Sequence, residues 1–494
     1  MRRLIAGLAA CLAIAAPAMG KTPVPTVSGP IPQAEANHAF GGAAYTLKPE
    51  DLAKSGFVEE EFFVSGKANV YDWPASGPVV RTPDAPYVTR ILVRRPARAA
   101  RFSGRVIVEM LNPTNLLDLN IGWAIHRDEF LRRGDAWVGI TAKPVAVVTL
   151  KTFNPQRYQA LDWGNPLPVN DPKNCAQRGD GSQNTENGLV WDMNTQIGAW
   201  IRSADPKNPF RYGGAASKAK WLYGWGYSQT GGFLYTYINA IHPLVVQADG
   251  RPMFDGYLVA VATGPSAINQ CAAAIPAGDP RRSFGPVGVP VIQVMSQSDY
   301  LNYVPQRRPD GNTPADRFRH YDNAGSGHAT PDELYWGPRP ADIVKGGRVP
   351  PPVDCNEGPR SRFPSRVPFN AELRMLEAWV EKGTAPPPSQ NIEVKDRQPV
   401  LDAHGNVTGG MRTPYLDAPT SVWYGNSTGP SFCRIGGHEL GFTPDKLKAL
   451  YPTHAAYVAA VTKSVEAGIK ARTITPEDGR WMIDEAKATA VPPR

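Results

Sequence analysis

The stretch Gly226-Tyr227-Ser228-Gln229-Thr230-Gly231-Gly232 places one serine among small residues. A serine hydroxyl attacks a carbonyl carbon efficiently only when a histidine takes its proton and a carboxylate orients that histidine. Such a serine lies on a sharp turn between a strand and a helix, where its side chain stands clear of its neighbours. Residues 220–226 are apolar and strand-like, and residues 229–241 are typical of a helix. Ser228 is therefore the candidate nucleophile of an acyl-transfer reaction.

The turn departs from the Gly-x-Ser-x-Gly pattern at Thr230, where a second glycine is expected. A side chain there sits where strand and helix come close together, but threonine is small and two glycines follow it. A strict match to the pattern occurs at Gly425-Asn426-Ser427-Thr428-Gly429. No apolar strand precedes that match and Pro430 follows it, so we interpret it as a surface turn.

The two partners that the serine needs occur downstream in the order acid, then histidine. Asp299 follows the predicted strand 289–295, and His328 lies in the glycine-rich loop after the predicted strand 317–321. Parallel strands end at the same edge of a sheet, so this order brings the three side chains together. The sequence predicts a triad of Ser228, Asp299 and His328.

Other acids and histidines are less suitable. Asp322 lies between the last strand and the histidine loop, where capping a turn is its simplest role. The remaining histidine candidates fall inside predicted elements or next to one, where packing explains them: His126, His242 and His320.

The tetrahedral intermediate needs backbone N–H donors for its oxyanion. We expect one from Gln229, the residue after the nucleophile, and one from the loop after strand 105–111. Pro113 has no N–H, so Leu111 or Asn112 is expected to donate. The side chain of Asn112 has the alternative role of binding the turn backbone.

Apolar runs alternate with helical patterns from residue 87 to about 383, which predicts an α/β fold with a mostly parallel sheet. We expect strands at 87–93, 105–111, 136–141, 220–226, 256–261, 289–295 and 317–321, and helices at 123–133, 190–203, 229–241 and 371–382, the last capped by Asn370. Long insertions at 153–187, 264–288, 301–315 and 330–369 are candidates for a lid or pocket wall. A turn-rich stretch follows residue 386 and leads into three helices with Thr443, Thr453 and Thr475 as N-caps.

The sequence resembles the α/β-hydrolase superfamily, and more narrowly the large exported bacterial α/β-hydrolase-domain proteins. The resemblance lies in GWAIHRDEFLRRGDAWVGITAKPVAV, NPQRYQAL, GYSQTGG, GSGHA and DAHGNVTGGMRTPYLDAP. It implies an eight-stranded, mostly parallel sheet with helices on both faces and a cofactor-free mechanism. It also implies that a helical C-terminal extension, 386–494, belongs with the hydrolase domain, 21–385.

Residues 1–20 combine Arg2 and Arg3, an apolar run at 4–16 and small residues up to Gly20. This pattern is typical of an export signal, since the run is shorter than the ~20 residues of a membrane-spanning helix. We expect a periplasmic or secreted protein without stable membrane insertion. Removing the signal lowers the formal charge from +8 by two, because it removes Arg2 and Arg3.

Export leaves four cysteines, Cys175, Cys271, Cys355 and Cys433, which predict two disulfides in an oxidising compartment. Three pairings are possible, and the sequence does not select one. No metal-ligand spacing occurs, so no metal is expected. The arginine-rich stretch from Arg94 to Arg105 lacks interleaved aromatic residues, so we interpret it as a solvated inter-strand loop and expect no nucleic-acid partner.

The combined expectation is an exported carboxylic-ester hydrolase that acts on a small-molecule or polymeric ester without a cofactor. Two alternatives remain open: an amide or peptide hydrolase with the same triad, and a non-catalytic binding protein on the same fold. The sequence does not indicate an oligomeric state.

Overall fold

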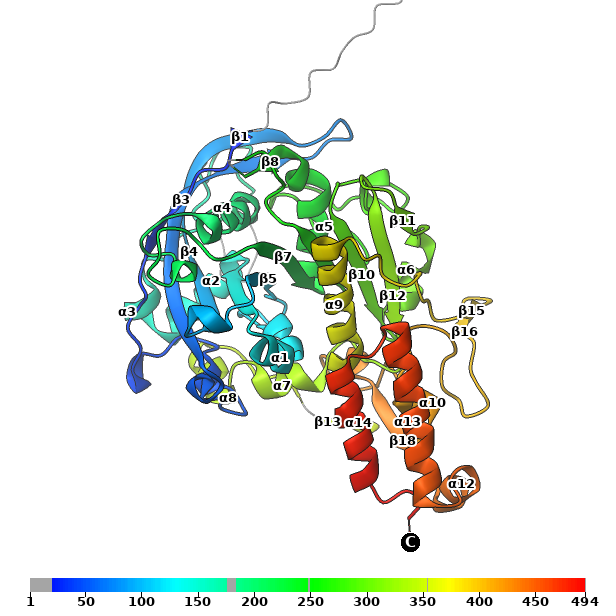
Figure 1. Cartoon of the computed structure of the whole chain (residues 1–494). Coiled ribbons are helices and arrows are strands. Elements are labelled where there is room, and N and C mark those ends of the chain that lie inside the picture. Colours follow the sequence, from blue (N-terminus) through cyan, green and yellow to red (C-terminus); the bar gives the residue numbers. More distant parts are fainter. Residues whose placement is uncertain (1–19, 176–183, 248, 353, 494) are drawn as a thin grey trace, which may run out of the picture.

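The computed structural model describes residues 20–175, 184–247, 249–352 and 354–493. The predicted export signal lies, apart from Gly20, outside the described residues. Within them, the main sheet has ten strands (Figure 1). These strands are β2 (Thr26–Ser28), β3 (Phe57–Asp72), β4 (Val79–Pro96), β5 (Arg105–Leu111), β6 (Ala136–Thr141), β7 (Trp221–Tyr227), β9 (Gly256–Ala260), β10 (Pro290–Ser296), β11 (Gly311–Asn312) and β12 (Arg317–Asn323).

The strand order is β11-β12-β10-β9-β7-β5-β6-β4-β3-β2. The six strands from β12 to β6 run parallel, whereas β4, β3, β2 and β11 are antiparallel to their neighbours. The expectation of a mostly parallel α/β sheet is confirmed, with ten strands in place of eight. Seven of the ten lie where sequence alternation predicts strands, and the additions are β2, β3 and β11.

The longest addition, β3, escapes prediction because three consecutive glutamates interrupt its apolar pattern. Its partner β4 supplies the compensating arginines. Arg94 Nε donates to Glu59 Oε2 at 2.7 Å, and Arg95 Nε donates to Glu60 Oε2 at 2.8 Å. Arg94 is fully buried. The interpretation of this arginine-rich stretch as a solvated loop is therefore wrong for Arg94 and Arg95, which are paired within the sheet.

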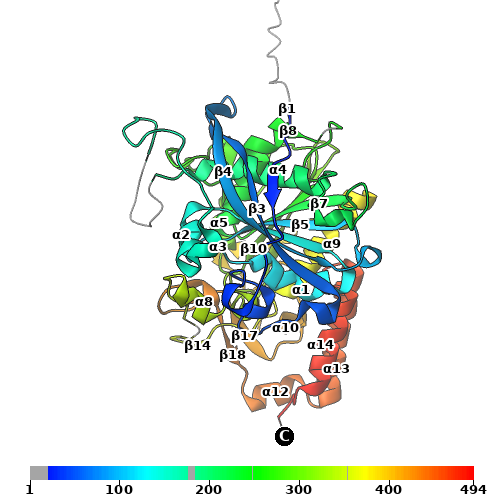
Figure 2. The ribbon, with the colours of Figure 1, turned by 90° about the vertical axis from the view of Figure 1, so that its left-hand side faces the viewer.

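Helices cover both faces of the sheet (Figures 1 and 2). Alternate residues of each strand point to opposite faces, so β5 sends Val106 and Val108 into one core and Ile107 into the other. The first core packs against α2 (Pro144–Phe153), α4 (Val190–Arg202) and α5 (Gln229–Thr236), and the second packs against α1 (Ile121–Arg133) and α9 (Arg366–Lys382).

Two helices differ from their predicted bounds. Helix α9 begins at Arg366 and not at 371, so Asn370 is an internal residue and the prediction that it is an N-cap is wrong. Its side chain bonds the imidazole of His126 and the carboxylate of Asp478 instead. The predicted helix 229–241 changes after Thr236 into a π-helical turn, Tyr237–Ile241.

The C-terminal extension lies below the sheet (Figure 1) and supplies most of a small core, to which Val367 of α9 also contributes. Its elements are β15 (Val394–Lys395), β16 (Gln398–Pro399), α10 (Pro414–Asp417), β17 (Ser421–Tyr424), α11 (Cys433–Gly436), β18 (His438–Gly441), α12 (Pro444–Leu450), α13 (His454–Ala471) and α14 (Pro476–Ala488). As predicted, the hydroxyls of Thr443, Thr453 and Thr475 accept backbone N–H groups at the starts of the last three helices.

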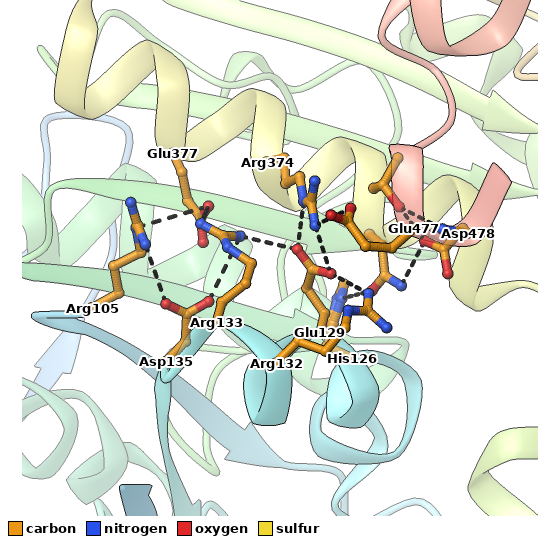
Figure 3. A network of polar contacts seen from close by, with 12 residues as sticks. Arg105, His126, Glu129, Arg132, Arg133, Asp135, Arg374, Glu377, Glu477 and Asp478 are labelled. Atoms are coloured by element: carbon orange, nitrogen blue, oxygen red, sulfur yellow. Dashed lines mark hydrogen bonds and ion pairs between the residues drawn. The ribbon is translucent and has the colours of Figure 1, made fainter. Parts of the chain in front are cut away.

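A polar network attaches α14 to the helices that cover the main sheet (Figure 3). Arg374 of α9 lies between Glu129 of α1, at 2.5 Å, and Glu477 of α14, at 2.8 Å. Arg133 of α1 binds both Glu129 and Glu377. Since Glu129 and Glu377 are withdrawn from water, each needs its arginine partner, and the network fixes the three helices against one another.

Smaller elements complete the described chain: β1 (Gly20–Lys21), α3 (Pro155–Tyr158), β8 (Val245–Val246), α6 (Tyr300–Tyr303), α7 (Pro331–Trp336), α8 (Pro340–Lys345), β13 (Asp354–Cys355) and β14 (Gly358–Pro359). The predicted pair of disulfides is confirmed, and the pairing is Cys175–Cys271 and Cys355–Cys433. The second disulfide joins the insertion 330–369 to the C-terminal extension.

Candidate active site

Ser228 occupies the strand-to-helix turn between β7 and α5. Its φ is +55° and its ψ is −116°, a conformation that a residue with a side chain rarely adopts. The Ser228 N–H donates to the carbonyl of Ala260 at the end of β9, at 2.9 Å. A Cβ atom on Gly226 would lie 2.4 Å from the Thr230 carbonyl oxygen, so this position requires glycine. The turn is therefore a strained strand-to-helix elbow, held in place by its neighbours.

Thr230, the residue that departs from the usual pattern, stabilises this elbow through its hydroxyl. Its hydroxyl accepts the N–H of Tyr227 at 3.2 Å and bonds the carbonyl of Tyr227 at 3.1 Å. The close approach that would need a glycine falls one residue later, because a Cβ on Gly231 would lie 2.5 Å from the Ala260 carbonyl oxygen. The helix therefore packs closely despite the threonine.

Asp299 and His328 are hydrogen-bonded to each other. Nδ1 of His328 lies 2.8 Å from Oδ2 of Asp299, and the two side chains are only 13% and 15% exposed. The hydroxyl of Ser296 also donates to Asp299 Oδ2. Tyr227 packs edge-on against the His328 ring and donates its hydroxyl to the His328 carbonyl at 2.5 Å. These contacts leave Nε2 as the ring nitrogen that is free to face a substrate.

The acid loop, 296–299, and the histidine loop, 324–329, are bonded to each other along their length. Gln297 N–H donates to the Ser326 carbonyl at 3.0 Å, and Gly325 N–H donates to Gln297 Oε1 at 2.7 Å. His328 N–H donates to the Ser298 hydroxyl at 2.9 Å. The two loops thus form one unit.

The C-terminal extension supports this unit. Ser298 donates its hydroxyl hydrogen to the Gly425 carbonyl, and Gln297 Nε2 donates to the Trp423 carbonyl at 3.1 Å. Ala329 N–H donates to the Ile435 carbonyl at 2.9 Å. Gly425 is the first residue of the strict Gly-x-Ser-x-Gly match at 425–429, so this match begins in contact with the acid loop. Ser427 within it is 7% exposed and bonded to His438, so the surface-turn interpretation is wrong for this serine.

The rejected acid and histidines lie away from His328. Asp322 binds His320 Nε2 at 2.7 Å and the N–H of Ile392 at 2.9 Å. His126 is bonded to Asn370, and His242 to the Tyr257 hydroxyl. Burial lowers the pKa of both His126 and His242 to about 4, so these two are neutral structural side chains at neutral pH.

Ser228 and His328 line the same cavity, which has a volume of about 80 Å³. Its wall is mostly apolar and is built from the loop after β5, the elbow, the histidine loop, the insertion 330–369 and the extension. The lining residues are Asn112, Thr114, Asn115, Leu119, Ile121, Tyr227, Ser228, His328, Ala329, Glu333, Leu334, Pro351, Arg360, Phe432 and Ile435. Of the four insertions predicted as pocket wall, 330–369 supplies lining residues among those described.

Of the expected oxyanion donors, Gln229 directly follows Ser228, whereas the N–H of Asn112 is already bonded within its own loop. Gln229 is the first residue of α5, so its N–H lies at the positive end of that helix. Leu111 is the buried last residue of β5. The N–H of Asn112 donates to the Leu119 carbonyl at 3.0 Å. The Asn112 amide donates to the Tyr227 carbonyl at 2.7 Å and accepts the N–H of Thr114 at 2.8 Å, so this side chain fastens the loop to the elbow.

Sequence reasoning assigned no role to several cavity residues, among them Asn115, Glu333, Arg360, Phe432 and Ile435. Asn115 Nδ2 is buried and has no hydrogen-bond partner in the described residues. The other four come from the insertion 330–369 and the extension, in stretches without regular periodicity. Two signals were available: the insertion 330–369, a candidate pocket wall, contains Glu333 and Arg360, and the cysteines Cys355 and Cys433 lie near Arg360, Phe432 and Ile435 in the sequence.

Charges around His328 set its proton affinity. Burial by itself would lower the pKa of His328, but the charge of Asp299, the hydrogen bond to it and the charge of Glu333 raise that pKa above its ordinary value of 6.5. Burial raises the pKa of Glu333 to about 7, against the opposing charges of Arg360 and His328. The cavity thus holds a basic imidazole beside a carboxyl group that is only partly ionised at neutral pH.

No group of three or more His, Cys, Asp or Glu side chains among the described residues is arranged to hold a metal ion. No helix within 20–175, 184–247, 249–352 and 354–493 has the length and apolar character to cross a membrane.

Comparison with known proteins identifies the family. Residues 27–484 match a protein-family model described as an alpha/beta hydrolase domain. No curated protein matches the sequence. Similar solved structures include esterase Est22, at 9% identity and a TM-score of 0.31 over 61% of this chain and 80% of that one. Another is the carboxylesterase Cest-2923 of Lactobacillus plantarum, at 10% identity and a TM-score of 0.29 over 50% and 86%. On the family match, which spans the sheet, the elbow and both loops, the chain belongs to the α/β-hydrolase domain family.

Proposed function

We propose that this protein is an exported serine hydrolase that cleaves carboxylic esters, with Ser228 as nucleophile, His328 as base and Asp299 as the orienting acid. The observation that carries the proposal is the bond from His328 Nδ1 to Asp299 Oδ2, at 2.8 Å, on a histidine that shares its cavity with a serine at positive φ. Serine, base and orienting carboxylate are the parts that acyl transfer by this route needs.

In the first half-reaction, Ser228 Oγ forms a bond to the carbonyl carbon while its proton moves to His328 Nε2. The tetrahedral intermediate then breaks its bond to the alcohol oxygen, which leaves with the proton from Nε2. In the second half-reaction, water attacks the acyl-enzyme, gives its proton to Nε2, and Ser228 Oγ recovers a proton as the carboxylic acid leaves. Asp299 stabilises the imidazolium in both steps and keeps its charge.

The oxyanion of both intermediates needs two donors. The first is the Gln229 N–H, at the start of α5. For the second, expected from Leu111 or Asn112, the cavity offers the amide of Asn115 as a further candidate, because this buried Nδ2 has no other acceptor in the described residues. Leu111 and Asn112 then hold the loop that carries Asn115.

Two disulfides support an oxidising compartment for the folded protein. Together with the signal-like residues 1–20, they make export part of the proposal.

The test is covalent labelling by a fluorophosphonate combined with steady-state hydrolysis of p-nitrophenyl acetate. We expect labelling of the wild type, none of Ser228→Ala, and a loss of about 10⁶ in kcat for that variant. Hydrolysis of the matched p-nitroanilide faster than the ester would make the protein an amidase instead. A folded wild type that neither labels nor hydrolyses either substrate would be a binding protein, and the proposal would be wrong.

A further inference from the structure

Arg360 is the guanidinium among the residues that line the cavity of Ser228 and His328. Its side chain is 3% exposed. A guanidinium has five N–H donors and no acceptor, and burying it is costly unless those donors are paired. The acceptors around Arg360 therefore indicate whether the residue is a structural element or one that awaits a ligand.

The N–H donors of Arg360 are only partly paired with acceptors. Nη2 donates to the Pro352 carbonyl at 2.7 Å. Nη1 lies 3.9 Å from Glu333 Oε1, beyond hydrogen-bonding distance. Nε is buried and has no partner in the described residues. The fully buried Arg90 differs, since Nε binds Glu61, Nη1 binds Asp118 and Nη2 binds the Phe40 carbonyl. Arg360 is thus a buried cation with unused donor capacity at a cavity wall.

The surrounding backbone holds the side chain in this place. Arg360 crosses Gly436, where a Cβ atom would lie 3.1 Å from its Cγ and 3.2 Å from its Cδ. Cys355 precedes Arg360 by five residues, and its disulfide partner Cys433 precedes Gly436 by three. The disulfide thereby joins the two segments of the cavity wall that carry Arg360 and Gly436. The guanidinium is therefore ordered without a ligand.

Glu333 does not neutralise Arg360 completely. The separation of 3.9 Å makes a weak pair, and the raised pKa of Glu333 means that part of the population carries no charge there at neutral pH. An anionic group that enters the cavity would meet the protein's positive charge at Arg360 without displacing a tight internal salt bridge.

We propose that Arg360 binds a carboxylate of the substrate, and that the preferred substrates are esters of short dicarboxylic acids with one carboxylate free. A guanidinium fork matches a carboxylate with two parallel hydrogen bonds. A cavity of about 80 Å³ that also holds Ser228 limits the distance between this carboxylate and the scissile carbonyl to a few bonds. The inference rests on the proposed ester hydrolysis and names its substrate class.

The test compares monoethyl succinate with ethyl levulinate, a neutral ester of nearly the same shape, by proton release in a pH-stat. We expect the wild type to hydrolyse monoethyl succinate with a kcat/KM at least about tenfold higher, since a hydrogen bond to a charged group contributes about 1.5–3 kcal/mol. In Arg360→Gln, the ratio of the two kcat/KM values should fall about tenfold or more, and in Arg360→Lys it should be partly restored. The matched control is Arg362→Gln, which removes an 81% exposed arginine paired with Glu439 and should leave the ratio unchanged.

A double variant, Arg360→Gln with Glu333→Gln, removes both charges and covers the case in which Arg360→Gln alone does not fold. Fluorophosphonate labelling of Ser228 in each variant reports whether the site is assembled. If both esters are hydrolysed with similar efficiency and the ratio does not respond to Arg360→Gln, the inference is wrong and the proposed function stands. If the folded wild type hydrolyses neither ester and does not label, the proposed function itself fails.

Discussion

Ser298 Oγ accepts the backbone N–H of His328 at 2.9 Å and so joins the acid loop to the histidine loop. The same hydroxyl donates its hydrogen to the Gly425 carbonyl of the C-terminal extension. One side chain therefore connects the base, the acid loop and a segment more than a hundred residues away.

Replacing this hydroxyl should impair catalysis without removing any group that reacts. In Ser298→Ala, the His328 N–H loses its acceptor, and we expect kcat to fall about 10- to 100-fold because small misplacements of a catalytic group are costly. The control is Ser389→Ala, since Ser389 accepts the N–H of His320, a structural histidine, in the same way at 2.8 Å. Equal rates for Ser298→Ala and the wild type would contradict the positioning role.

The amide of Asn115 is expected to stabilise the oxyanion. Asn115→Ala should lower kcat about 10²- to 10³-fold and leave KM nearly unchanged, because the interaction strengthens only in the transition state. Asn165 is a suitable control, since its amide nitrogen is also buried without a partner but lies outside the cavity. A decrease in kcat of less than threefold for Asn115→Ala would contradict this donor role.

Thr230→Val keeps the shape of a buried side chain but removes its hydroxyl. The Tyr227 N–H would lose its acceptor, and we expect the free energy of unfolding to fall by about 1–3 kcal/mol. Thr230→Ser keeps the hydroxyl and should cost about 1 kcal/mol or less, for one methyl group. Urea denaturation measures both. A valine variant as stable as the serine variant would show that the hydroxyl does not hold the elbow.

The charge of Glu333 should be visible in the pH profile. Catalysis needs neutral His328, so kcat/KM should rise with pH through a midpoint above 6.5. Glu333 helps to raise the pKa of His328, so Glu333→Gln should move this midpoint to lower pH. Glu357→Gln, on an exposed carboxylate outside the cavity, is the control. A midpoint that stays in place, or moves upward, in Glu333→Gln would contradict the assigned electrostatics.

The two disulfides should differ in their effect on activity. Removing either bridge by double Cys→Ser substitution should lower stability, typically by about 2–4 kcal/mol. Only loss of Cys355–Cys433 should also lower kcat/KM, because Arg360, Phe432 and Ile435 lie within five residues of this bridge and line the cavity. Thermal melts and ester hydrolysis separate the two effects. Equal losses of kcat/KM for both bridges would show that the wall does not depend on its own disulfide.

The order of the proposed triad could be predicted from the sequence because each of its three residues follows a predicted strand. Strands β7 and β10 have clear apolar runs, whereas β12 carries only Phe318 and Tyr321 among polar residues. Parallel strands deliver their carboxyl ends to one edge. This reasoning placed Ser228, Asp299 and His328 at one end of the sheet without any knowledge of distances. The strand β3 could not be predicted in this way, because its glutamates are stabilised by arginines more than 30 residues away.

The part of the cavity wall that the C-terminal extension supplies could not be predicted from the sequence either. Phe432 and Ile435 belong to a segment with no local pattern, and they reach the cavity through tertiary contacts with the histidine loop and a disulfide. Asn370 illustrates the same limit: its position suggests a helix cap, but the buried partners His126 and Asp478 decide its role. Local preference is overridden where a polar side chain has two buried partners from distant elements.

The carbonyls of Trp423, Gly425 and Ile435 receive hydrogen bonds from the acid and histidine loops, so a gene shortened after Lys382 would encode a sheet whose reactive loops had lost their outer anchors. Fusion partners, affinity tags and mutant libraries are therefore best designed on the uncut reading frame, with the last hundred residues treated as part of the same folded unit and not as an accessory.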